Sequence, residues 1–149
     1  RLSQTGEGAD LALPDKESYA LFLEQYLAAS KRNPLLGFKE GLLNIIRQRQ
    51  GESHLPGCTG SGCGAAFNFV ALLPDGEVYA CRKFPSLIGN IRNSSLSNIY
   101  ASPEAEGYRK GPLACKKCPL WKHCGGCQAV TSGSGLNPLK DRDPFCFLN

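Results

Sequence analysis

The stretch CKKCPLWKHCGGC, residues 115–127, places four cysteines within thirteen positions. The four form two C-x2-C pairs that are separated by five residues. Thiols this close in sequence are typical of a disulfide framework, a zinc site or an iron–sulfur site. The remaining cysteines of the chain are Cys58, Cys63, Cys81 and Cys146. How these eight thiols divide among sites therefore decides the fold.

Composition limits the alternatives. The chain has 149 residues, of which 42% are hydrophobic, so one domain can build its own core without relying on disulfides. The net charge of +4 comes from scattered basic residues, which gives no support to nucleic-acid binding. Apolar runs such as FNFVALLP are too short to cross a bilayer. The absence of an initiator methionine and of a signal segment predicts a piece of a longer cytoplasmic protein.

The first half of the chain has the pattern of two helices. Pro14 and Asp15 precede a helical stripe of five apolar residues, Tyr19, Phe22, Leu23, Tyr26 and Leu27. Asn33 and Pro34 predict the start of a second helix that ends near Gly51. Its expected apolar face is formed by Leu35, Phe38, Leu42, Ile45 and Ile46. Both stripes are typical of core packing.

The second half changes character. A glycine-rich loop after Gly51 is followed by two β-prone runs around the turn PDG, residues 74–76, which predict a hairpin that leads into Cys81. Ser102 and Pro103 predict the start of a short helix. The fold class expected is therefore α+β, with a helical part at residues 1–56 and a cysteine-rich domain at residues 57–149.

Spacing alone leaves the chemistry of the thiols open. A C-x2-C pair is tight for a structural disulfide, and neither pair is followed by the histidine of a c-type haem site. Four thiolates of one site within thirteen residues would strain the loops, so sharing them between two four-sulfur sites is easier. All-sulfur sites suit either zinc or iron–sulfur clusters.

The order of the cysteines resembles the SPASM domain, the C-terminal extension of radical S-adenosylmethionine enzymes that modify peptides and proteins. The resemblance rests on Cys58, Cys63, then G-x4-C ending at Cys81, a gap, C-x2-C-x5-C-x2-C, a gap and Cys146. DGEVYAC, IGNI, SLSNIY and GGCQA are also similar to family sequence. One departure is the last spacer, which has two residues where the commoner form has three.

The resemblance implies two [4Fe–4S] clusters with interleaved ligands. Auxiliary cluster I would take Cys58, Cys63, Cys81 and Cys127. Auxiliary cluster II would take Cys115, Cys118, Cys124 and Cys146. Because each cluster then has four cysteine ligands, structural and electron-transfer roles are expected rather than direct ligation of substrate. Trp121 and Phe145 are candidates to shield the clusters from water.

The resemblance also implies what lies outside this chain. Residues 1–9 are similar to the closing strand of a partial β/α barrel, followed by linking helices. The barrel motif C-x3-C-x2-C that binds the catalytic cluster and S-adenosylmethionine is absent, so the chain is expected to be inactive alone. Expected partners are a peptide or protein substrate and an external electron donor or acceptor, without nucleic acid or membrane.

Other interpretations remain beside this one. A zinc-stabilised binding module without a redox role is the main alternative, and a fragment prepared in air could hold zinc or no metal. His54 and His123 could replace a missing ligand, but no ligand is missing. The anaerobic sulfatase maturases carry a carboxylate where this chain has Arg82, which argues against that activity.

Overall fold

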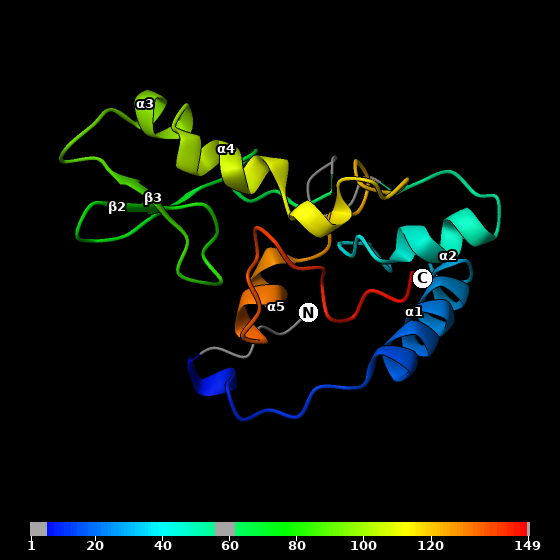
Figure 1. Cartoon of the computed structure of the whole chain (residues 1–149). Coiled ribbons are helices and arrows are strands. Elements are labelled where there is room, and N and C mark those ends of the chain that lie inside the picture. Colours follow the sequence, from blue (N-terminus) through cyan, green and yellow to red (C-terminus); the bar gives the residue numbers. More distant parts are fainter. Residues whose placement is uncertain (1–5, 56–61, 149) are drawn as a thin grey trace.

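The computed structural model describes residues 6–55 and 62–148, and its fold is α+β, as the sequence predicts. Two helices, α1 (Lys16–Ser30) and α2 (Leu43–Arg49), lie at one side of the molecule (Figure 1). The sheet lies at the other side with α3 (Leu96–Tyr100) and α4 (Pro103–Lys110), and α5 (Gln128–Gly133) lies between the two parts. Two 3-10 turns cover Gly6–Gly8 and Leu113–Cys115. No helix in the described ranges is long and apolar enough to span a membrane.

Helix α1 confirms the first predicted helix. The Asp15 carboxylate caps its start by accepting a hydrogen bond from the Ser18 backbone N–H at 2.6 Å. Tyr19, Leu23 and Leu27 are buried at i, i+4 and i+8. Phe22 is 52% exposed, so the buried stripe is narrower than the sequence pattern indicates.

The second predicted helix forms only in its C-terminal part, where Leu42, Ile45 and Ile46 are buried as expected, and its predicted start is wrong. The Asn33 side chain accepts a hydrogen bond from the Leu35 backbone N–H at 3.0 Å and supports a turn, and Leu35 is 90% exposed. Helix α2 begins only at Leu43, although it ends close to Gly51 as expected. The reason is local, because Gly37 and Gly41 weaken the helix between Pro34 and Leu43.

The sheet contains the predicted hairpin and one further strand. Strands β1 (Ala71–Leu72) and β2 (Glu77–Tyr79) pair antiparallel around the PDG turn, where Gly76 has a φ of 89°. Strand β3 (Leu87–Asn90) pairs antiparallel with the other edge of β2. The sequence patterns did not predict β3, which covers the IGN residues of the family-like segment.

Two hydrophobic cores flank the cysteines. The first joins α1 and α2 to Leu120, Val130 and the chain end, and it contacts Cys118, Cys124, Cys127 and Cys146. The second lies between the sheet, α3 and α4, and it contacts Cys63 and Cys81. Helix α4 starts as predicted, since the Ser102 hydroxyl accepts from the Ala105 N–H at 3.2 Å and Pro103 follows the cap. The cysteines are thus set between two separately packed halves.

Asn44 on α2 links the helical part to the segment beside Cys124 through buried hydrogen bonds. It is fully buried, its amide nitrogen donates to the carbonyls of Leu55 (3.0 Å) and His123 (2.9 Å), and its oxygen accepts from the Leu55 N–H. We expect Asn44→Ala to lower the free energy of unfolding by about 3 kcal/mol, because buried backbone groups lose their partners. Urea denaturation measures the change, and exposed Asn98→Ala serves as the control. Equal stability of the two variants would contradict this role.

Candidate metal centre

Seven of the eight cysteines lie within the described residues, and none of the seven forms a disulfide. Cys58, assigned to cluster I by the resemblance, lies outside the described residues. Cys115 and Cys124 are buried, each 8% exposed, and the other five are partly buried. Free thiols that are partly or fully sheltered from water are suited to bind soft metal ions.

Three of the cysteines line one cavity, which we call cavity I. Cys63, Cys81 and Cys127 share it with the aromatic rings of Phe69 and Phe84. Its other charged or polar lining residues are Lys39, Arg82, Lys83 and Gln128. The three sulfur residues come from the loop after residue 62, from the end of β2 and from the start of α5. Segments far apart in sequence therefore converge on cavity I.

The other four described cysteines line a second cavity, which we call cavity II. Its sulfur residues are Cys115, Cys118, Cys124 and Cys146, and none of them lines cavity I. Trp121 lines cavity II together with apolar residues of the first core, including Leu42, Ile45 and Leu120. Phe145 is buried in that core and is not among the lining residues. The grouping of the described cysteines by cavity is the same as the grouping that the resemblance implies.

The pKa shifts of two cysteines indicate the same neighbouring cysteines as the cavities do. Burial raises the pKa of the Cys81 thiol, and nearby Cys127 raises it further. In cavity II, burial raises the pKa of Cys115, followed by the effects of Cys146 and Cys118. Raised pKa values keep these thiols neutral in the metal-free protein, so metal binding must displace their protons.

Cys81 is held by a compact turn after β2. Its backbone N–H donates to the Ser86 hydroxyl oxygen at 3.0 Å, and the same hydroxyl lies 3.1 Å from the Cys81 carbonyl. The backbone N–H of Lys83 donates to the Cys81 sulfur and opposes the rise of its pKa. Such N–H donors stabilise a thiolate and the negative charge of a bound metal group.

The segment from Cys124 to Cys127 crosses from cavity II to cavity I. Gly125 and Gly126 both have positive φ, at 62° and 65°, and Gly126 donates its N–H to the Cys124 sulfur at 3.5 Å. Glycine adopts positive φ readily, so these two residues let the backbone turn from one cavity to the other.

A buried carboxylate that the sequence analysis missed joins the two sites. Asp143 is 3% exposed and accepts the Cys127 N–H at 2.7 Å through one oxygen and the Phe145 N–H at 3.0 Å through the other. Its carbonyl accepts the Cys146 N–H at 2.9 Å. The sequence signal was Asp143 followed by Pro144, a pattern in which the aspartate side chain bonds the backbone two residues on.

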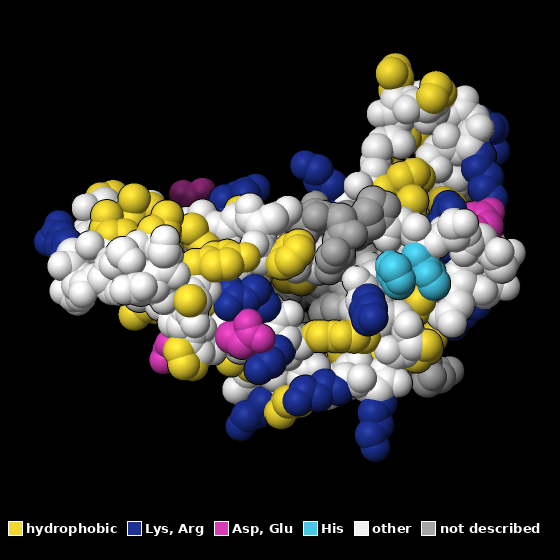
Figure 2. All heavy atoms as spheres, turned by 90° about the horizontal axis from the view of Figure 1, so that it is seen from above, with side chains coloured by type: hydrophobic (Ala, Val, Ile, Leu, Met, Phe, Trp, Pro, Cys, Tyr) yellow, Lys and Arg dark blue, Asp and Glu magenta, His cyan; other side chains and the backbone are white. Residues whose placement is uncertain are grey.

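The two histidines stack on each other rather than on a cysteine cavity. The rings of His54 and His123 lie 4.5 Å apart between centroids, with 24° between their planes, and Figure 2 shows them in contact on the surface. Neither histidine lines cavity I or cavity II. The observation favours the interpretation that they are not cluster ligands.

The donor set fits iron–sulfur ligation in its chemistry. Both cavities are lined by several cysteines without disulfides, and each cavity has a cysteine whose sulfur accepts a backbone N–H. Across residues 6–55 and 62–148, no three histidine, cysteine or carboxylate side chains meet the geometry of a single-ion site. The cysteines fit a thiolate-bound group, and they are the residues that would hold it.

Comparison with known proteins gives an independent result. Residues 63–128 match the family model of SPASM, described as an iron–sulfur cluster-binding domain. The chain is 30% identical over 146 residues to the antilisterial bacteriocin subtilosin biosynthesis protein AlbA of Bacillus subtilis, which covers 91% of this chain and 29% of that protein. It is also 30% identical over 113 residues to the AdoMet-dependent heme synthase of Methanosarcina barkeri, covering 73% of this chain and 31% of that protein. No solved structure gives a significant match.

Proposed function

Because this chain carries a SPASM iron–sulfur cluster-binding domain, we propose that it holds two [4Fe–4S] clusters and serves a radical S-adenosylmethionine enzyme that modifies a peptide or protein. The chain spans less than a third of either relative, so the catalytic barrel and bound S-adenosylmethionine belong to a longer protein in this proposal. The observation that carries it is the convergence of the cysteines on two separate cavities.

The proposed ligands follow the cavities. Cys63, Cys81 and Cys127, with Cys58 as the fourth, hold cluster I. Cluster II is held by the four cysteines that line cavity II, which are Cys115, Cys118, Cys124 and Cys146. A bound [4Fe–4S] cluster supplies one-electron transfer, and the chain contributes thiolates, N–H donors to sulfur and apolar walls that exclude water.

The distribution of charge along the chain supports the binding of two negatively charged clusters. Residues 57–149 contain ten basic and six acidic residues, a net charge of +4, whereas residues 1–56 contain seven of each. A four-iron cluster on four thiolates carries about −2, so two of them bring the cysteine-rich part close to neutral. The basic excess therefore lies in the part of the chain that would receive the negative clusters.

A peptide is the proposed substrate class. The alignment with the bacteriocin biosynthesis protein extends over 91% of this chain, so it includes most of the helical part as well as most of the cysteine-rich part. The heme synthase aligns over a shorter stretch, 73% of the chain. The proposed partners are therefore a peptide or protein substrate and an external electron donor or acceptor, in a reducing compartment such as the cytoplasm.

Reconstitution with iron and sulfide under anaerobic conditions tests the proposal. We expect about eight irons and about eight labile sulfides per chain, with EPR signals of reduced [4Fe–4S] clusters. A parallel incubation with zinc is the control, because an all-cysteine site can also take this ion. Tight binding of about one or two zinc ions, without stable iron binding, would overturn the redox function and favour a zinc-built module.

A further inference from the structure

Ala66 has an unusual backbone conformation close to the proposed cluster I. Its φ of 52° is the only positive value at a non-glycine residue in the described part of the chain, and the residue is fully buried. An L-residue in this left-handed region costs about 1–2 kcal/mol. Such a conformation persists only where surrounding contacts hold it. Ala66 lies three residues after Cys63, so whatever holds it also fixes the turn that follows this cysteine.

Two hydrogen bonds hold the Ala66 backbone from opposite sides. Its N–H donates to the carbonyl of Ala80 at 2.9 Å, and Ala80 directly precedes Cys81. Its carbonyl accepts from the Nη1 atom of Arg109 at 3.0 Å. The turn after Cys63 is therefore fixed between the segment that carries Cys81 and the last turn of α4.

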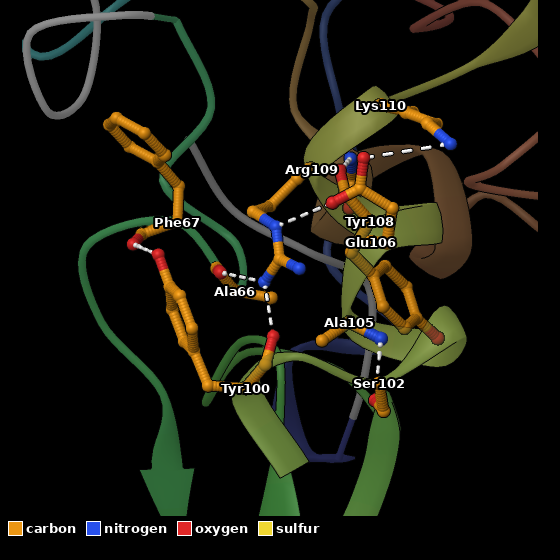
Figure 3. A network of polar contacts seen from close by, with 10 residues as sticks. Ala66, Phe67, Tyr100, Ser102, Ala105, Glu106, Tyr108, Arg109 and Lys110 are labelled. Carbon is orange, nitrogen blue, oxygen red and sulfur yellow. Dashed lines mark hydrogen bonds and ion pairs between the residues drawn. The ribbon is translucent and has the colours of Figure 1, made fainter. Parts of the chain in front are cut away.

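The guanidinium of Arg109 is the centre of the network in Figure 3. The same Nη1 atom also donates to the Tyr100 carbonyl at 2.8 Å, and Nε donates to the Glu106 carboxylate at 3.0 Å. The guanidinium carbon lies 4.6 Å from the centre of the Tyr100 ring. The Tyr100 hydroxyl donates to the Phe67 carbonyl at 2.7 Å. Arg109 thus holds Ala66 directly and Phe67 through Tyr100.

We infer that Arg109 is a positioning residue for cluster I, which holds the Cys63 turn against the strand end that carries Cys81. The inference rests on the proposed function, since it names what keeps two of the proposed ligands in register. This role requires arginine, because the planar guanidinium donates hydrogen bonds in several fixed directions, whereas a lysine ammonium cannot reproduce that geometry. Arg109 does not line cavity I, so it acts through the backbone of its neighbours.

Arg109→Met tests the inference in the reconstituted chain. We expect iron to fall from about eight to about four per chain, as for loss of a single [4Fe–4S] site. The remaining EPR signal should match that of Cys81→Ala, which marks cluster II. Arg109→Lys should show the same selective loss to a smaller extent. Lys110→Met is the matched control, because Lys110 is exposed and bonds the same carboxylate of Glu106 at 3.5 Å.

A second variant separates positioning from general folding. Ala66→Gly removes the backbone strain, since glycine adopts positive φ readily. We expect Ala66→Gly to restore part of the cluster I signal in the Arg109→Met background while leaving iron near eight in the wild-type background. Loss of both clusters in Arg109→Met, or no change in either, would overturn the inference. Failure of the wild-type chain to bind iron would instead refute the proposed function, so the two failures are distinguishable.

Discussion

Cys81→Ala and Cys146→Ala should each lower the iron content of the reconstituted chain from about eight to about four, and the double variant should bind almost none. The reason is the separation of the two cavities, because Cys81 lines cavity I and not cavity II, whereas Cys146 lines cavity II and not cavity I. A cluster that loses one of four thiolate ligands is exposed to solvent and to loss of iron. Iron and sulfide analysis with EPR measures the outcome.

The double variant makes this prediction decisive. If Cys81 and Cys146 served one cluster, the double variant would keep about four irons, the same as each single variant. The EPR signals give a second criterion, since the two single variants should retain different clusters with different spectra. Exposed Ser97→Ala controls for handling of the protein. Cys58→Ala should behave like Cys81→Ala, which would test the proposed ligand outside the described residues.

The cysteine sites stay a prediction, and the family resemblance groups the described cysteines in the same way as the two cavities do, whereas parts of the scaffold differ from the sequence prediction. The order of the cysteines is a long and specific pattern, so a family resemblance could assign partners that spacing alone left open. The second helix failed because its apolar periodicity outweighed Gly37 and Gly41 in the prediction. Gly41 has a packing reason, since a Cβ there would lie 2.9 Å from the Cys124 carbonyl oxygen. That approach joins residues far apart in the chain and has no local signal.

The two charged residues that link the cysteine segments were not predicted, because their contacts also join residues far apart in the chain. Asp143 and Arg109 are ordinary charged residues in the sequence, and only the folded chain shows that both bond the backbone beside cysteines or their turns. Charged residues are mostly exposed, so a single sequence gives no ground to single out two of thirty. Their roles depend on contacts between segments that the cysteine pattern does not describe.

Gly126→Ala should impair both clusters, because this glycine lies between ligands of cavity I and cavity II. A Cβ at Gly126 would lie 2.7 Å from the Asp143 Cβ, which is closer than real Cβ atoms approach, and the φ of 65° adds strain. Relief of the clash must shift Asp143, which bonds the Cys127 N–H, or the glycine N–H that donates to the Cys124 sulfur. We expect iron to fall from about eight to below about four, with both EPR signals reduced.

Gly125→Ala is the matched control for this substitution. Gly125 has a similar φ of 62°, but a Cβ there would meet its nearest atoms at 3.9 Å, an ordinary contact. It should therefore carry only the backbone cost of about 1–2 kcal/mol, visible as a lower melting temperature with iron still near eight per chain. The difference between the two variants isolates the contact between Gly126 and Asp143. Equal iron loss in both variants would mean that backbone strain alone limits cluster binding. That result would contradict a role for the contact between Gly126 and Asp143.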